Sequence, residues 1–166
     1  MMMEALPLAS AFRFTGEDLQ ANRQGKVTAA QRRRLWRRLF VVFFGGLLLL
    51  LVPILLAWSL ITFATSQSFS EAFWDGRMFS GYLVGLLLWS IYLGANYRTW
   101  LLGLDLLRGK VISVAGPVRV WGRYLILEDY QFVIDETALS LVKTGLRYRV
   151  FTLPSSCTLL SIEFSE

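Results

Sequence analysis

Side chains that commonly carry catalysis are scarce in this sequence. Its 166 residues include one cysteine, Cys157, and no histidine. Nucleophilic sites of the Ser/His/Asp and Cys/His types need a histidine as base, and a structural zinc site needs about four Cys, His or carboxylate ligands. We therefore expect no catalytic residue, no metal site and no cofactor, and we predict that the protein is not an enzyme.

Two pairs of neighbouring carboxylates are the remaining candidates for acid–base chemistry, Glu128-Asp129 and Asp135-Glu136. Adjacent side chains diverge on a helix or a strand, so neither pair directs two carboxyl groups at one point. Such residues are common in turns and at helix N-termini. We interpret both pairs as turn and capping residues.

A third concentration of charge is basic and flanks uncharged sequence. It consists of Arg32, Arg33, Arg34, Arg37 and Arg38, with Arg98 beyond a second uncharged block. Arginines beside a membrane span keep that side of the span cytoplasmic and attract anionic lipid by about 1 kcal/mol each. Basic runs also bind nucleic acid. Because the whole run lies within about two helical turns of the uncharged block, we expect anionic lipid, and not nucleic acid, as its partner.

The two uncharged blocks are long enough to cross a membrane. They run from Leu39 to Phe63 and from Met78 to Tyr97, in a chain that is 55% hydrophobic with mean hydropathy +0.50. A hydrocarbon core of ~30 Å needs about 20 helical residues. The rest of the chain is too short to bury two such helices, and the 38 residues before the first block are too many for a signal peptide. We predict two uncleaved transmembrane helices.

Charge on either side of these helices predicts their orientation. Residues 1–38 contain eight basic and three acidic side chains, whereas the connecting residues 64–77 contain one basic and two acidic ones. Positive residues near a span are retained in the cytoplasm, so we expect both termini to be cytoplasmic in the plasma membrane. Tryptophan prefers the membrane–water interface, and four are expected to be interface anchors: Trp36, Trp58, Trp74 and Trp100.

Small residues four apart are predicted helix-packing positions in the second block. The two pairs are Gly81 with Gly85 and Ser90 with Gly94. Such a stripe lets another helix approach closely where no hydrophobic force exists between helices. The stripes either pack the two spans on each other or dock a second protein or a second copy of the chain.

The last sixty residues have the alternation and turn signals of strands. We expect strands over 107–115, ended by a turn at Gly116-Pro117, over 118–128 with a bend at Gly122, and over 131–134. A short helix capped by Asp135 and further strands over 146–153 and 158–164 follow. This order predicts a small all-β barrel of the OB type, with an SH3-like barrel as the alternative. A possible partner face of the barrel comprises Arg119, Trp121, Arg123, Arg147 and Arg149.

The segment GLRYRVFTLPSSCTLLSIE, after GKVISVAGPVRV and two apolar helices, carries a resemblance. It is similar to the ending of a group of bacterial two-helix membrane proteins with a C-terminal small β-barrel, over residues 107–166. The resemblance implies a bacterial origin, and with it a bacterial inner membrane as the location, and a cytoplasmic barrel. It implies no activity and no functional residue. The types of residue at Phe151 and Cys157 depart from the pattern of that group.

We therefore expect a membrane α-helical hairpin plus a cytoplasmic β-barrel, in six segments. These are a flexible cytoplasmic segment (1–27), a basic helix running into the first span (28–63), an external loop (64–77), the second span (78–101), a linker (102–106) and the barrel (107–166). The predicted function is that of an accessory or scaffold subunit of a larger membrane complex, with other membrane subunits or further copies as partners. The alternative is a membrane-tethered sensor whose barrel binds a small ligand or nucleic acid.

Overall fold

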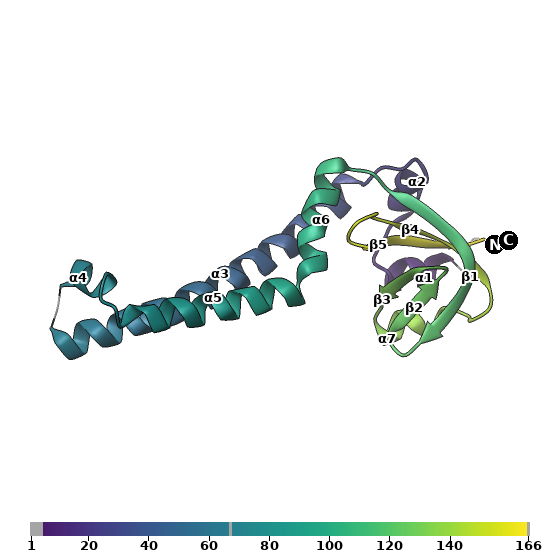
Figure 1. Cartoon of the computed structure of the whole chain (residues 1–166). Coiled ribbons are helices and arrows are strands. Elements are labelled where there is room, and N and C mark those ends of the chain that lie inside the picture. Colours follow the sequence, from purple (N-terminus) through teal and green to yellow (C-terminus); the bar gives the residue numbers. More distant parts are fainter. Residues whose placement is uncertain (1–4, 67, 166) are drawn as a thin grey trace. The chain divides into compact units, whose positions relative to one another are not determined.

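The computed structural model describes residues 5–66 and 68–165, and its elements fall into two compact units (Figure 1). Residues Arg38–Trp100 form one unit, and the chain up to Arg37 together with the chain from Leu101 forms the other. The helices are α1 (Ala5–Ala11), α2 (Gly16–Arg23), α3 (Ala29–Thr65), α4 (Phe69–Phe73), α5 (Met78–Ala95), α6 (Tyr97–Arg108) and α7 (Glu136–Leu139). The strands are β1 (Ile112–Trp121), β2 (Tyr124–Leu127), β3 (Tyr130–Val133), β4 (Arg147–Thr152) and β5 (Leu159–Phe164).

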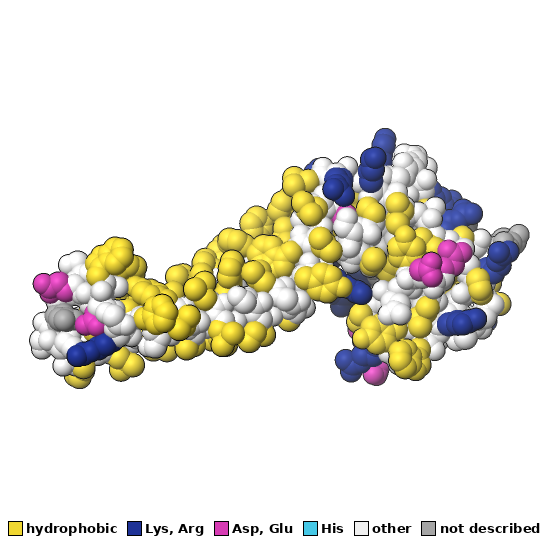
Figure 2. Space-filling view, in the orientation of Figure 1, with side chains coloured by type: hydrophobic (Ala, Val, Ile, Leu, Met, Phe, Trp, Pro, Cys, Tyr) yellow, Lys and Arg dark blue, Asp and Glu magenta, His cyan; other side chains and the backbone are white. Residues whose placement is uncertain are grey.

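The helical unit consists mainly of α3 and α5, which run side by side (Figure 1). Both helices have the length and the apolar composition that a membrane crossing requires. Their large apolar side chains are mostly exposed, as at Leu60 (69%) and Leu87 (61%), and hydrophobic side chains cover the visible surface between the ends of the unit (Figure 2). A core helix of a soluble protein would bury this surface.

The connection between the two long helices contains the short helix α4. Its capping box joins Ser68 and Glu71, with the Ser68 hydroxyl donating to the Glu71 carboxylate at 2.6 Å and the Ser68 backbone N–H donating to it at 3.1 Å. These two hydrogen bonds hold the pKa of Glu71 below its ordinary value of 4.5, and the bond from the Ser68 hydroxyl has the larger effect.

The helix that begins at Met78 ends earlier than the span expected over 78–101. Asn96 interrupts it, and its side chain donates to the Tyr92 carbonyl at 3.0 Å. Asparagine favours such local bonds over continued helix. A separate helix, α6, then begins at Tyr97 and includes residues 102–106, where a linker was expected.

The strands form one open antiparallel sheet in the order β3-β2-β1-β4-β5. The long central strand β1 changes partner along its length: Ile112–Pro117 pairs with β4, and Val118–Trp121 pairs with β2. In the described residues no pairing closes β3 onto β5. The sequence thus correctly predicts two apolar helices and an antiparallel sheet, with the order of three strands, a helix and two strands.

The prediction of a turn at Gly116-Pro117 is wrong, because β1 runs through both residues. Pro117 has no N–H to donate. Val118 exchanges backbone hydrogen bonds with Gly145 and Leu146, on the β4 side. Since successive backbone groups point to opposite sides of a strand, position 117 points to the β2 side, where β2 has already ended at Leu127. The proline therefore lies where no partner needs its N–H.

The strand expected over 118–128 is instead a hairpin. Trp121 pairs with Tyr124, so Gly122 and Arg123 form a two-residue loop. Gly122 has φ of +58° while Arg123 does not have positive φ, a pattern typical of type II′ hairpin turns, in which glycine takes the first position.

The N-terminal segment, expected to be flexible over 1–27, is helical from Ala5 and packs against the core of the sheet from Leu8 onward. Thr15 and Asp18 form a capping box that begins α2, and the Asp18 carboxylate also accepts a hydrogen bond from the Thr28 hydroxyl. Asn22 donates to the Ser161 hydroxyl of β5 at 2.8 Å. Apolar residues between the polar ones give this segment a packing face, with Phe14 buried in the core.

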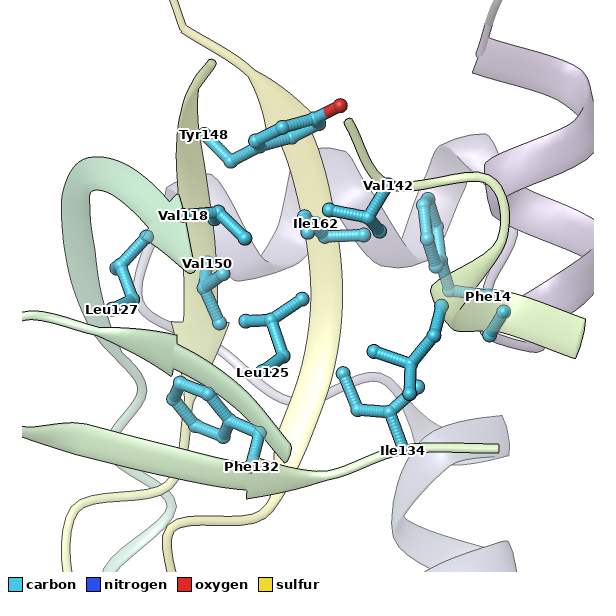
Figure 3. Close-up of a cluster of buried hydrophobic side chains, with 12 residues drawn as sticks. Phe14, Val118, Leu125, Leu127, Phe132, Ile134, Val142, Tyr148, Val150 and Ile162 are labelled. Carbon is cyan, nitrogen blue, oxygen red and sulfur yellow. The ribbon is translucent and has the colours of Figure 1, made fainter. Parts of the chain in front are cut away.

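The core lies among the inward side chains of the strands, α7 and the N-terminal segment, which point toward one another (Figure 3). Alternate strand positions supply most of it, as a half-exposed sheet requires. The hydroxyl of buried Tyr148 accepts from the Lys143 N–H at 3.2 Å. The buried residues are Phe14, Val118, Leu125, Leu127, Phe132, Ile134, Ala138, Leu139, Val142, Tyr148, Val150 and Ile162.

Candidate functional site

Both carboxylate pairs lie at turns, and neither forms a catalytic arrangement with other described residues. Glu128 and Asp129 make the two-residue connection between β2 and β3. Asp135 precedes α7, and Glu136 lies 3.7 Å from the Arg123 guanidinium, with both side chains exposed. Within the described ranges, no three His, Cys, Asp or Glu side chains are grouped as metal ligands. Cys157 is half-buried against the core in a turn, with φ of +50°.

The outward face of the sheet carries an exposed apolar row across three strands. Trp121 of β1 pairs with Tyr124 of β2, which pairs with Val133 of β3. Their exposed fractions are 73%, 42% and 67%. Directly paired side chains on one face contact each other, so these three form a continuous patch. We name Trp121, Tyr124 and Val133 the aromatic row.

Of the five residues expected on a partner face, four lie at outward positions of the strands: Arg119, Trp121, Arg147 and Arg149. Arg119 is two residues from Trp121 on β1, and Arg123 lies in the hairpin loop beside it. Arg147 and Arg149 pair with Pro117 and Ala115, in the half of β1 that contacts β4. Arg149 is 3.6 Å from Glu163. The structure therefore places Arg119 beside the aromatic row, the Arg123 guanidinium near Glu136 of α7, and the other two arginines on β4.

The arginines of the basic run are exposed on α3. Arg32 donates to the Leu106 carbonyl at 3.1 Å, and Arg34 donates to the Arg13 carbonyl. The helix begins with a capping box: the Gln31 backbone N–H donates to the Thr28 hydroxyl at 3.1 Å, and the Thr28 backbone N–H donates to the Gln31 side-chain oxygen at 3.4 Å. Leu35 is buried in a second cluster. The basic run thus has one packed face and one charged face, and its exposed members are Arg32, Arg33, Arg34, Arg37 and Arg38.

One predicted stripe of small residues faces the neighbouring helix, and the other does not. A Cβ at Gly81 would lie 2.6 Å from the Ala57 Cβ, and one at Gly85 would lie 2.7 Å from the Leu50 carbonyl oxygen. A Cβ at Gly94 would meet nothing within 4 Å, and Ser90 is exposed. The first stripe therefore packs the hairpin, and the second is on its open surface.

A second close approach, from the other helix, comes from Gly45 and Gly46 of α3. A Cβ at Gly45 would lie 2.8 Å from the Tyr92 hydroxyl oxygen, and one at Gly46 would lie 3.1 Å from the ring of Tyr92. Glycines on both helices thus let α3 and α5 approach at two levels.

The four tryptophans expected as interface anchors have different surroundings. Trp74 is 85% exposed, and Trp58 contacts the Phe73 ring edge-on, with centroids 6.5 Å apart. Trp36 is half-buried against the second cluster. Trp100 contacts Phe43 edge-on at 6.0 Å, and its buried Nε1 has no hydrogen-bond partner within the described part of the chain. Arg98 lies over the Tyr97 ring, 5.9 Å from its centroid.

The sequence analysis missed Asp105, a fully buried carboxylate in α6. It accepts the backbone N–H of Ser155 at 3.1 Å and that of Ser156 at 2.7 Å, in the turn between β4 and β5. Its neighbours Leu102 and Leu106 belong to the second cluster, with Leu35, Leu153 and Leu160. A single acidic residue in the apolar run LLGLDLLR was the signal for this contact.

Comparisons of the chain with protein-family models, with curated proteins and with solved structures found no match. A function must therefore be inferred from the surfaces described above.

Proposed function

We propose that this protein is a two-span membrane anchor whose cytoplasmic sheet unit docks a partner, as an accessory or scaffold subunit of a larger membrane complex. Two features of α3 and α5 support the membrane crossing. Their exposed surfaces are apolar, and lipid is the environment in which such surfaces are stable. Their close contacts are made by glycine, the residue on which helix packing in membranes depends.

In the proposed orientation both termini lie in the cytoplasm of a bacterial cell. The arginines before Leu39 are exposed, so they are accessible to lipid phosphates. The far end of the hairpin carries Glu71, Asp75 and Arg77, without an excess of positive charge. This asymmetry supports retention of the basic side in the cytoplasm.

We further propose that the sheet unit is an open relative of the OB-type barrel. The strand order β3-β2-β1-β4-β5, with a helix between β3 and β4, supports this assignment. The division of β1 between two partners supports it as well, because a strand shared by two parts of a sheet allows the sheet to curve toward closure.

The observation that carries the docking function is the aromatic row. Trp121, Tyr124 and Val133 are contiguous and exposed, beside Arg119. Exposed apolar patches rimmed by polar residues mark interaction sites, and Trp, Tyr and Arg dominate the binding energy of protein interfaces. Hydrophobic side chains are visible at the surface over β2 and β3 (Figure 2). The exposed pair Ser90 and Gly94 gives a second surface, suited to another membrane helix or a second copy.

The test is purification of the tagged full-length chain from its native membrane in mild detergent, followed by native mass measurement. We expect a partner protein at defined stoichiometry. The double variant Trp121→Ala, Tyr124→Ala should reduce recovery of that partner about tenfold or more, because hot-spot truncation costs about 2 kcal/mol or more. Leu141→Ala, which truncates an exposed leucine outside the row, is the matched control. A chain that purifies alone, or a double variant that keeps its partner, contradicts the proposal.

A further inference from the structure

Helix α6 has a first apolar face that is buried in the sheet unit. Leu102 and Leu106 are each 1% exposed, and Asp105 between them is fully buried. These residues are three and four apart, so they lie on one side of the helix. This side packs on Leu35, Leu153 and Leu160, and Asp105 ties it to the turn after β4.

The opposite side of α6 is also apolar but is exposed. Tyr97, Leu104 and Leu107 are 55%, 49% and 72% exposed. With 3.6 residues per turn, these three positions lie within about 80° of one another and face away from Leu102 and Leu106. Soluble helices bury one apolar stripe and present polar residues on the other side. An exposed second stripe therefore needs a partner of its own.

The chain itself indicates which partner this is. Tyr97, the first residue of α6, follows the last residue of α5 by only two positions. If α5 crosses the bilayer, the first turn of α6 must lie where hydrocarbon meets water. An aromatic residue at the start of a helix is typical of this depth.

The charges around the exposed stripe favour an anionic lipid surface. Arg98 and Arg108 lie on α6, and Lys110 follows it. The acidic residue of the helix, Asp105, is fully buried on the other side. The exposed surface of α6 is therefore positive as well as apolar, and both properties bind amphipathic helices to membranes that contain anionic lipid.

We propose that the stripe of Tyr97, Leu104 and Leu107 lies in the cytoplasmic surface of the bilayer, with Arg98, Arg108 and Lys110 on lipid phosphates. In this arrangement the exposed side of α6 contacts the lipid interface, and its buried side packs on the sheet unit. This proposal rests on the proposed membrane crossing of α5, and the experiment separates the two.

Single-cysteine variants of the full-length chain provide the test, in a Cys157→Ser background and in vesicles of phosphatidylcholine and phosphatidylglycerol. Leu104→Cys and Leu107→Cys report on the stripe, Leu86→Cys reports on the middle of α5, and Gln131→Cys on β3 is the exposed control. Each is labelled with an environment-sensitive fluorophore. Quenching is measured with nitroxide lipids that carry the spin label either near the headgroup or in the middle of the acyl chain.

We expect labels at 104 and 107 to be quenched most by the shallow nitroxide, the label at 86 by the deep one, and the label at 131 by neither. If the label at 86 is quenched but the labels at 104 and 107 are quenched no more than the label at 131, the interfacial placement is overturned and the membrane crossing is not. Absence of quenching at 86 overturns the crossing, and the interfacial placement with it. The substituted leucines are exposed, and an unchanged circular dichroism spectrum verifies that each variant is folded.

Discussion

Asp105 illustrates how one residue fastens a helix to a sheet. Its buried carboxylate is satisfied by two backbone N–H groups of the turn at Ser155 and Ser156. Backbone amides are fixed in position, so they hold the carboxylate without the entropy cost of ordering long cationic side chains. The Asp105 carboxylate in turn provides the acceptor for the backbone N–H groups of Ser155 and Ser156, which would otherwise lack a hydrogen-bond partner.

Replacement of Asp105 by alanine should destabilise the sheet unit by about 2–4 kcal/mol, because it leaves the buried N–H of Ser156 and the half-buried N–H of Ser155 without their acceptor, at about 1–3 kcal/mol for each such donor. Hydrogen exchange of the full-length protein in detergent measures this change, with faster exchange expected at Ser155 and Ser156. Asp105→Asn, which retains one acceptor oxygen, should have a smaller effect. Glu136→Ala, an exposed acid, is the control. Equal protection of the turn in Asp105→Ala and Glu136→Ala contradicts the assigned role.

The sequence predicts the exposure or burial of single side chains where it follows from their preference for water. It does not predict burial that depends on a partner far away in the sequence. Exposure of Arg32 and Arg33 follows from their charge. The burial of Asn22 and Asp105 depends on Ser161 and on the turn at Ser155, which lie far away in the sequence. Nothing local in the chain specifies those partners.

Glycine pairs determine how the two long helices pack. At Gly81 and Gly85 of α5, and at Gly45 and Gly46 of α3, atoms of the other helix occupy the space that a side chain would need. In the proposed membrane setting, apolar side chains gain nothing by leaving lipid for one another, so this close contact would be a main source of attraction between the helices.

Gly85→Ala should weaken this packing and lower the Tm of the protein in detergent, because its Cβ would lie 2.7 Å from the Leu50 carbonyl oxygen of a rigid helix. The expected loss is about 1 kcal/mol or more after the helix propensity gained by alanine. Gly94→Ala is the matched control, since it adds the same methyl group to the same helix where nothing lies within 4 Å. Its Tm should be unchanged or higher. Equal Tm values for the two variants would rule out this packing role.

Sequence predicts the existence of these elements better than their ends. Apolar length and alternation were sufficient for α3, α5, β3, β4 and β5, whereas they did not separate β1 from β2. The signal at Gly116-Pro117 failed because a turn dipeptide is also compatible with a strand that changes partner, and pairing with β2 and β4 is not encoded locally. Closure of a barrel depends on the same long-range pairing, and the described sheet is open.

The sheet unit is assembled from both ends of the chain, with the helical hairpin inserted between them. Phe14 belongs to the core of the sheet, Leu35 belongs to the second cluster, and Asn22 bonds to β5. The segment 107–166, expected to be a module by itself, therefore lacks part of its own core.

Phe14→Ala should destabilise the sheet unit by about 3–5 kcal/mol, as expected for removal of a buried phenylalanine. Urea unfolding of the full-length protein in detergent, followed by circular dichroism of the strands, measures the change. Lys26→Ala, an exposed position in the same N-terminal segment, should alter stability by less than about 0.5 kcal/mol. A Phe14 variant as stable as the Lys26 variant would show that the N-terminal segment is dispensable to the fold.

The hydrogen bond from Asn22 to Ser161 joins residues 139 positions apart, and it has a consequence for biosynthesis. When α1 and α2 leave the ribosome, β5 has not been made, and both long apolar helices are synthesised before it. The apolar faces of the N-terminal helices therefore remain uncovered until β5 has been synthesised. Synthesis of β5, and not emergence of the N-terminal helices, is the event that allows the sheet unit to complete its fold.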